Sequence, residues 1–209
     1  AKARDLLSYW VDGENTPERL VRALERFGRN EQISVRALNV KDFDGEVARI
    51  KEIYNSAWER NWGFVPMTRD EFMFQAKGLK PLLIPQFAFI AEVNGEPAGF
   101  MLCVPHFNEI LKRIPDGRLF PFGFLRILAG KSKLRRGRIM ALGIKAQFRS
   151  GSVLPVFMHE SLRRAVAYGS TGAEASRILE ENTAMRQPID AWGGRVYRKW
   201  RIYERPLAT

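Results

Sequence analysis

The sequence predicts an α/β protein of the α+β type, in which helices flank a mixed, mostly antiparallel and twisted sheet. Three observations lead to this class: alternating apolar runs typical of strands, amphipathic runs with capping residues, and their order. From residue 31 onward that order is strand, helix, helix, three strands, helix, strand, helix and strand. Because two neighbouring strands are joined by a tight turn, a doubly wound parallel sheet is excluded.

The first 30 residues predict a strand and a linker helix. "LLSYWV" (6–11) is typical of a short strand, and "TPERLVRALERFG" (16–28) of a compact helix. In that helix Thr16 is a plausible N-cap, Pro17 suits the first position and Gly28 ends it. We interpret residues 1–30 as an attachment that leads into a main domain over residues 31–209.

The first half of the main domain begins with a strand at 33–38 and a helix at 42–58. Thr68 followed by Glu71 forms a capping box, which predicts a second helix to about Gly78. Asn94 and Gly95 stand between two apolar runs, the strongest short-range hairpin pattern. We therefore expect antiparallel strands over 86–93 and 97–105.

The second half predicts a strand at 138–144, a helix at 153–169, a strand at 173–179 and a final strand at 195–204. Pro188 predicts a broken helix before that last strand. Residues 107–137 are expected to be irregular, and they combine phenylalanines with many arginines and lysines.

The composition constrains the ligands more than the fold. The 209 residues carry a net charge of +11, and a surface this basic attracts anions such as nucleic acid, anionic lipid, an acidic protein or a phosphorylated cofactor. The single cysteine, Cys103, excludes an intramolecular disulfide, and the sequence has no Cys/His cluster for a metal. No apolar run approaches the roughly 18 residues of a membrane-spanning helix. We expect a cytoplasmic protein.

The loop "QFRSGSV" (147–153) stands between an apolar strand and a long amphipathic helix. The start of a helix carries free N–H groups and partial positive charge, which together bind phosphate. Gly151 permits close backbone approach, Ser150 and Ser152 add hydroxyl donors, and Gln147 and Arg149 add side-chain donors. A plain strand-to-helix turn capped by Ser152 is the alternative interpretation.

Several motifs together resemble a known family. Gln147 opens a Gln-x-x-small-x-small loop, Asn182 stands at the next helix start, and Gly193–Gly194 precedes the last strand. This arrangement resembles the Gcn5-related N-acetyltransferase (GNAT) superfamily over about residues 31–204. "IYNSAWERNWGFVPMT" and "GRLFPFGFLRIL" further resemble a bacterial branch with two tandem domains of this type. In that case the chain is the C-terminal half, and residues 1–9 are the last strand of the preceding domain.

The resemblance implies an acyl-CoA N-acyltransferase fold, with acetyl-CoA or another acyl-CoA as donor and an unknown amine as acceptor, which attacks the thioester directly. It also implies a set of cofactor-binding residues. The set is Leu142, Gly143, Ile144, Gln147, Arg149, Ser150, Gly151, Ser152, Val153 and Asn182. The strand residues would hold pantetheine through the backbone, the loop amides would hold the pyrophosphate, and Asn182 would contact the cofactor or fix its turn.

Candidate catalytic groups follow from the residues near the expected site. The family often has a tyrosine, as acid for the departing thiolate, where this chain has Ile189; Tyr197 or Tyr203 could replace it. His106 and Glu92 are candidate bases. Trp62 and Phe64 are assigned to the acceptor pocket.

Two departures leave other functions open. The serines of the loop add bulk where a backbone must approach phosphate, which suits a non-catalytic binding module of the same fold. The basic segment 107–137 is most simply a solvated loop that packs on a preceding domain. The alternatives are a contact with an anionic membrane, a clamp on the 3′-phosphate of CoA, and a nucleic-acid surface, although no specific nucleic-acid motif is present.

Overall fold

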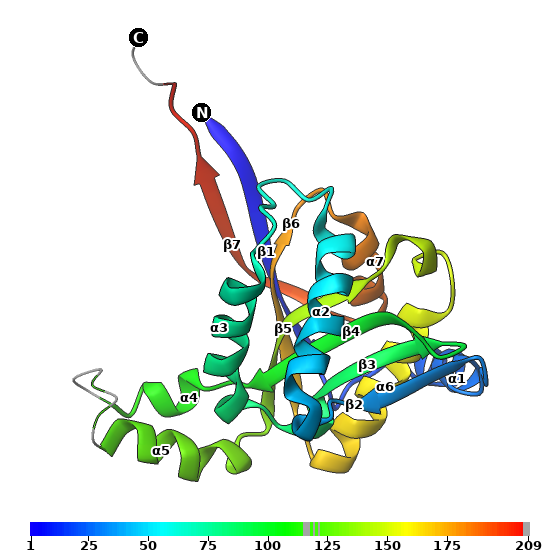
Figure 1. Cartoon of the computed structure of the whole chain (residues 1–209), viewed down its shortest axis with the longest axis horizontal. Coiled ribbons are helices and arrows are strands. Elements are labelled where there is room, and N and C mark those ends of the chain that lie inside the picture. Colours follow the sequence, from blue (N-terminus) through cyan, green and yellow to red (C-terminus); the bar gives the residue numbers. More distant parts are fainter. Residues whose placement is uncertain (115–117, 119, 121, 207–209) are drawn as a thin grey trace.

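A seven-stranded sheet organises the chain in the computed structural model, which describes residues 1–114, 118, 120 and 122–206 (Figure 1). The strand order is β2-β3-β4-β5-β6-β1-β7. The strands are β1 (Lys2–Asp12), β2 (Ile33–Ala37), β3 (Ala88–Val93), β4 (Glu96–Pro105), β5 (Arg136–Ile144), β6 (Gly172–Leu179) and β7 (Arg195–Tyr203). Among the pairs of neighbouring strands in the described residues, only β5 and β6 are parallel. The predicted mixed, mostly antiparallel sheet is confirmed.

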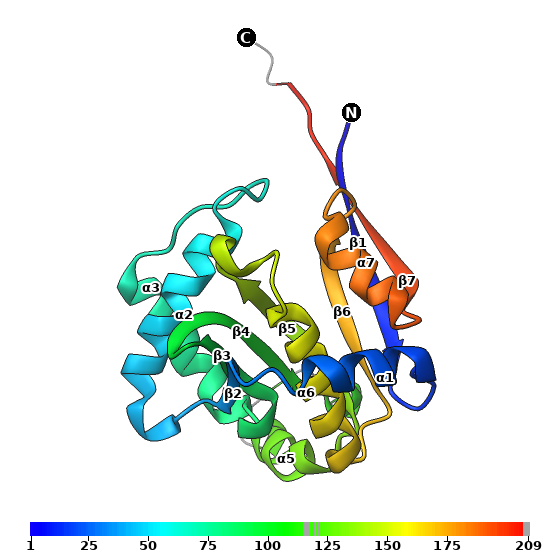
Figure 2. The ribbon, with the colours of Figure 1, turned by 90° about the vertical axis from the view of Figure 1, so that its right-hand side faces the viewer.

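Helices cover both faces of this sheet. One face carries α1 (Glu18–Phe27), α6 (Val153–Tyr168) and α7 (Thr183–Ala191), and the other carries α2 (Phe43–Trp58) and α3 (Arg69–Leu79) (Figure 2). Two further helices, α4 (Asn108–Leu111) and α5 (Phe122–Gly130), lie in the connection between β4 and β5. Among the described residues, no helix has both the length and the apolar character needed to cross a bilayer.

The local capping and turn predictions are confirmed. The hydroxyl of Thr68 accepts a hydrogen bond from the amide of Glu71, and the Glu71 carboxylate accepts one from the amide of Thr68. Asn94 and Gly95 have φ angles of 51° and 85°, as a two-residue hairpin turn requires. Both features depend on residues close in sequence, and for this reason the sequence alone predicts them.

Two local expectations are wrong. The segment 107–137 is not irregular throughout, because its described residues include α4 and α5; residues 115–117, 119 and 121 lie outside the described chain. The helix α7 is not broken at Pro188, which lies inside it. A proline at the sixth position of a short helix removes one backbone hydrogen bond, and the rest of the helix persists because its buried Ile189 packs against the sheet.

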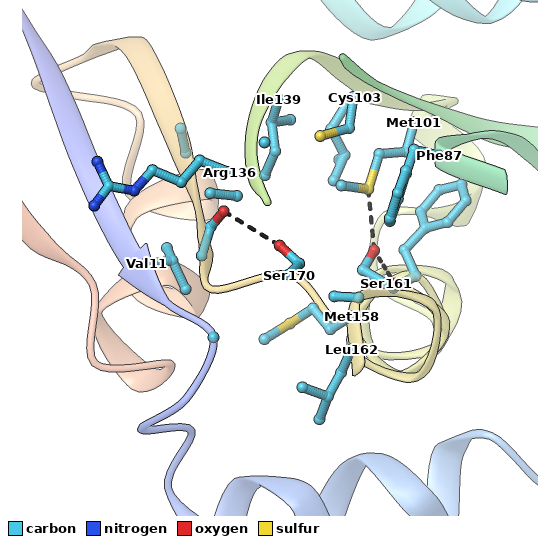
Figure 3. A pocket seen from close by; sticks show the side chains of 18 of the residues that line it. Val11, Phe87, Met101, Cys103, Arg136, Ile139, Met158, Ser161, Leu162 and Ser170 are labelled. Carbon is cyan, nitrogen blue, oxygen red and sulfur yellow. Dashed lines mark hydrogen bonds between the residues drawn. The ribbon is translucent and has the colours of Figure 1, made fainter. Parts of the chain in front are cut away.

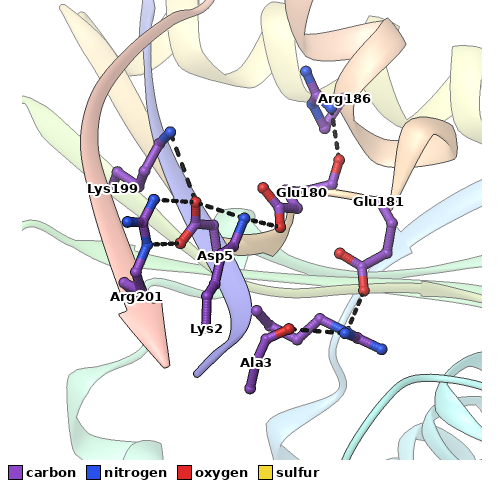
Figure 4. A network of polar contacts seen from close by, with 9 residues as sticks. Lys2, Ala3, Asp5, Glu180, Glu181, Arg186, Lys199 and Arg201 are labelled. Atoms are coloured by element: carbon purple, nitrogen blue, oxygen red, sulfur yellow. Dashed lines mark hydrogen bonds and ion pairs between the residues drawn. The ribbon is translucent and has the colours of Figure 1, made fainter. Parts of the chain in front are cut away.

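The strand β1 lies inside the sheet, between β6 and β7, and α1 packs against α6. Residues 1–30 therefore share a sheet with the rest of the chain, while the domain boundary at residue 30 stays a prediction. A buried carboxylate holds β1 to β7 (Figure 4). Asp5 is 1% exposed and accepts hydrogen bonds from Arg201 at 2.8 and 3.0 Å, while Lys2 lies 3.1 Å away. Hydrogen bonds from Arg201 and Lys2 outweigh burial and hold the pKa of Asp5 well below its ordinary value.

We predict that Asp5→Asn lowers the free energy of unfolding at neutral pH and that this difference shrinks in acid. A carboxylate with a lowered folded-state pKa stabilises the fold fully above its unfolded pKa of about 3.9. That contribution is lost as the pH falls from there toward the folded value. Urea unfolding at pH 7, 5 and 3 measures it, with the exposed Asp190→Asn as a charge-matched control. Equal destabilisation at all three pH values would contradict the assignment.

Candidate active site

The central feature of the site is the point where β5 and β6 separate. Their parallel pairing runs from Arg136↔Gly172 to Ile139↔Ala175 and then stops, although both strands continue. On the other edge of β5, Leu102 pairs with Ala141 and Cys103 with Ile139, so Met140 is an extra, bulged residue. Figure 2 shows β2–β5 and β6–β1–β7 as two wings that diverge beyond this point. The main chain of β5 from Met140 onward therefore has no strand partner on the edge that faces β6.

The helix α6 begins beside this separation, and its first amides are available to a ligand. In the described part of the chain no hydrogen bond reaches the N–H groups of Ser150, Ser152, Val153 or Leu154. Ser152 precedes the helix but makes no side-chain capping hydrogen bond, so the interpretation of this loop as a serine-capped turn is wrong on that point. Free N–H groups at the start of a 16-residue helix create a positive field that favours anions.

The polar side chains around the loop are used to position it. The Arg149 guanidinium donates to the carbonyl oxygens of Ala57 (2.6 Å) and Ile144 (3.2 Å), which ties the loop to the end of α2. The Gln147 amide donates to the Glu96 carboxylate at 3.1 Å. Asn182 caps α7 by accepting a hydrogen bond from the amide of Met185 at 3.2 Å. Asn182 was expected either to contact the cofactor or to fix the strand-to-helix turn, and this hydrogen bond fits the second role.

The strand residues expected to bind pantetheine have side chains that serve the core. Ile144 packs with Phe157 of α6, and Leu142 lines a cavity on that same face. Gly143 faces α2, where a Cβ atom would lie 2.5 Å from the Trp58 ring. Only the main-chain groups of these residues remain for a cofactor. The sequence analysis likewise expected them to bind pantetheine through the backbone.

A polar cluster lies on the α2 face, one residue pair before the strands separate. The buried carboxylate of Glu174, from β6, accepts two close hydrogen bonds from Arg138 of β5, at 2.8 and 2.9 Å. The Nδ1 atom of His106 lies 3.6 Å from this carboxylate. The hydroxyl of Tyr197 on β7 also interacts with it. Two residues selected from the sequence, His106 and Tyr197, thus converge on Glu174, which sequence reasoning missed.

The charges of the cluster follow from burial and pairing. Burial alone would raise the pKa of Glu174, but hydrogen bonds from Arg138 and Tyr197 hold it below its ordinary value. Burial lowers the pKa of His106 and outweighs its attraction to Glu174. The pKa of Tyr197 is raised by burial and by its hydrogen bond to Glu174. Near neutral pH the cluster therefore holds a carboxylate, a neutral imidazole and a protonated phenol.

Glu92, Trp62 and Phe64 lie outside this cluster. The Glu92 carboxylate forms an ion pair with Arg36 at 2.8 Å. In the hairpin Glu92 lies opposite Pro97 of β4, and Pro97 precedes His106 by nine residues. Along an extended strand that separation is roughly 30 Å. Trp62 is 48% exposed, with the Arg4 guanidinium 5.8 Å from its ring centroid. Phe64 packs against Tyr54 at the end of α2.

Part of the basic segment 107–137 forms a second, polar feature. Five cations and one carboxylate surround a cleft of about 540 Å³ at the end of β5 opposite the phosphate loop. They are Lys112, Arg113, Lys133, Arg135, Arg136 and Glu109. These cations therefore add positive charge to the surface at one end of β5, while the loop before α6 lies at the other end.

The sheet order, the separated parallel strands and the helix that joins them define the fold of the GCN5-related N-acetyltransferases. The structure matches a GCN5-related N-acetyltransferase from Sphaerobacter thermophilus with a TM-score of 0.60 and 15% identity, over 96% of this chain and 51% of that one. It matches FemX with a TM-score of 0.51 and 10% identity, over 96% of this chain and 62% of that one. The predicted resemblance is confirmed at the level of the fold.

Two curated proteins are similar in sequence along 99% of the chain. One is Protein YghO of Escherichia coli K12, at 32% identity, and the other is the Bacterial ceramide synthase of Caulobacter vibrioides, at 34% identity. The alignments cover 54% and 55% of those proteins, so the chain spans about half the length of the curated relatives it matches. No protein-family model matches the chain.

We predict that Gly143→Ala destabilises the protein by about 1–3 kcal/mol, because the added methyl group collides with Trp58 in a packed core. Chemical denaturation measures the change. Gly151→Ala is the matched control, since its Cβ would make only an ordinary 3.5 Å contact with the Phe148 carbonyl oxygen. A Gly143→Ala protein as stable as this control would show that Trp58 does not constrain β5.

Proposed function

We propose that the chain carries the donor site and the proton-transfer groups of an acyl-CoA-dependent N-acyltransferase, which transfers an acyl group to an amine by direct attack. The observation that carries this proposal is the set of unpartnered amides at the start of α6, beside the separation of β5 and β6. A diphosphate needs several N–H donors and a positive field, and this loop supplies both. When bound, acyl-CoA supplies a thioester carbonyl whose C–S bond is exchanged for the C–N bond of an amide.

The chain's own main chain performs most of the binding. The amides of Ser150, Ser152, Val153 and Leu154 hold the diphosphate, and Arg149 keeps the loop in place through its contacts with Ala57 and Ile144. The free edge of β5 beyond Ile139 offers peptide groups to the amide-containing arm of the donor. Fixing the donor in this way removes much of the entropic cost of bringing it to the amine.

His106 is the proposed base, and Tyr197 the proposed proton donor. Its lowered pKa leaves the His106 imidazole neutral, so the ring can accept the proton that the amine loses, while its buried Nδ1 atom faces Glu174. Glu174, held by Arg138, positions the imidazole and stabilises its charged form. The raised pKa of Tyr197 keeps its proton on the hydroxyl, from which it can reach the departing sulfur.

The name of one relative supports amide formation. A ceramide is an amide of a long-chain amine, so a protein named Bacterial ceramide synthase makes a C–N bond to an acyl group. The alignment with that protein spans 99% of this chain and so covers every position of the proposed site. This likeness favours an acyltransferase over a binding module that has lost its chemistry.

The donor site is tested by Ser152→Asp. Aspartate before a helix stabilises it, but its charge repels a diphosphate, so binding should weaken while stability is kept. We expect the Kd for CoA to rise by roughly tenfold or more, about 1.4 kcal/mol, without a lower melting temperature. Ser152→Asn is the neutral control, and ATP and a short DNA duplex test for general attraction to polyanions. Equal binding of CoA, ATP and DNA, unaffected by Ser152→Asp, would contradict the donor site.

The base is tested by pH and by substitution. Because burial lowers the pKa of His106, the rate of amide formation should fall only when the pH drops below about 6.5, the ordinary histidine value. His106→Gln should lower kcat by about 10²–10⁴-fold with CoA binding intact and should remove this acidic limb. The other histidine, His159 on α6, provides the control His159→Gln. CoA binding without any turnover in the unmodified protein would identify a non-catalytic module instead.

A further inference from the structure

An apolar cavity of about 150 Å³ lies between α6 and the sheet (Figure 3). Its wall comes from one stripe of α6, from β4, β5 and β6, and from α7. It extends from Leu142 and Leu154, beyond the point where the strands separate, to Gly137 and Gly172 beneath their paired part. The cavity thus reaches from the first turn of α6, at the proposed donor site, to the paired part of β5 and β6.

The polar groups in its wall are already satisfied. Ser161 donates to the Phe157 carbonyl oxygen at 2.6 Å, and Ser170 donates to the Arg135 carbonyl oxygen at 3.0 Å. The Arg136 guanidinium points out of the cavity and lies 5.5 Å from the Trp10 ring centroid (Figure 3). The interior therefore offers almost no hydrogen bonds, and only an apolar ligand matches it.

Two residues that looked unusual in the sequence belong to this wall. Ile189 stands where the resembled family often has a tyrosine, and here it is 8% exposed and lines the cavity. Cys103 also lines it, and burial raises the pKa of this thiol to about 12, so it remains neutral. Ile189 is apolar where the family pattern would place a tyrosine hydroxyl, and Cys103 adds a neutral thiol in place of a charged thiolate. Both residues therefore keep the wall apolar.

The volume indicates what fills the space. Apolar cavities of about 150 Å³ stay dry and take up hydrocarbons of roughly six carbons. Left empty, such a space costs stability because its lining loses contacts. A ligand that enters from the donor site and is apolar along its length would remove that cost.

We propose that this cavity holds the alkyl chain of the acyl donor, so that the site takes acyl chains of about six carbons or longer in preference to acetyl. This inference rests on the proposed function. It assigns opposite faces of the sheet to the two partners: the alkyl chain lies on the α6 face, and the amine approaches the His106 cluster on the α2 face.

The test is a chain-length series. The Kd values of CoA, acetyl-CoA, butyryl-CoA and hexanoyl-CoA are measured by calorimetry below their micelle concentrations. Each buried methylene should tighten binding about fourfold, so hexanoyl-CoA should bind on the order of 100-fold more tightly than acetyl-CoA. Ala165→Leu, which fills the far end of the cavity from α6, should reduce this ratio to about tenfold or less. Ala167→Leu, on the exposed face of the same helix, should keep it.

The outcomes separate the two proposals. If CoA binds and the series is flat, the cavity is not an acyl site, while the proposed function stands. If CoA itself does not bind, the proposed function and this inference both fail. Should Ala165→Leu not fold, Ala173→Val narrows the same cavity from β6 and gives the same comparison. An unchanged ratio in a folded cavity variant overturns the inference.

Discussion

The rest of the structure depends on one interruption: the parallel pairing of β5 and β6 that stops at Ile139 and Ala175. Parallel neighbours need a long crossover, and here α6 supplies it. The helix must therefore begin at the end of β5 where the pairing has stopped. That requirement places the free amides of a long helix beside the free edge of a strand. The bulge at Met140 makes the interruption local, because β5 keeps its pairing with β4 on its other side.

The same strand pair separates apolar from polar chemistry. Successive side chains of a strand point to opposite faces, so Ile139 and Ala175 face α6 while their neighbours Arg138 and Glu174 face α2. Neighbouring residues of one strand therefore serve different surroundings: one lines the wall of the apolar cavity, and the next belongs to a buried ion pair. The paired part of β5 and β6 carries both, and each proposed substrate has its own face of the sheet.

The sequence predicted the features that depend on residues close together in the chain. It missed the contacts between residues that are far apart in the chain and meet only in the folded sheet. The capping box at Thr68 and the hairpin at Asn94–Gly95 are encoded within a few residues, so the sequence alone predicts them. Arg138 and Glu174 lie 36 residues apart, and only the register of two parallel strands brings them together. The contact of Arg149 with the end of α2 was missed for the same reason, because the two segments lie far apart in the sequence, and its assignment to the cofactor stays a prediction. The position of β1 between β6 and β7 is likewise invisible to local patterns.

The chain departs from the family pattern at the two serines of the loop and at the tyrosine missing from α7. Both departures are consistent with an active site, because other groups can supply the same interactions. The loop presents main-chain N–H groups, and serine has the same N–H group as the glycine it replaces, so Ser150 and Ser152 remove no donor. At Gly151 itself an added Cβ would make only an ordinary 3.5 Å contact with the Phe148 carbonyl oxygen, so the packing of the loop tolerates a side chain there as well. The tyrosine missing from α7 leaves Ile189 in an apolar wall, while Tyr197 from β7 reaches Glu174 from the other face. The proposed proton donor and the wall of the cavity therefore come from two different elements, β7 and α7, so the side of the sheet that α7 covers stays apolar.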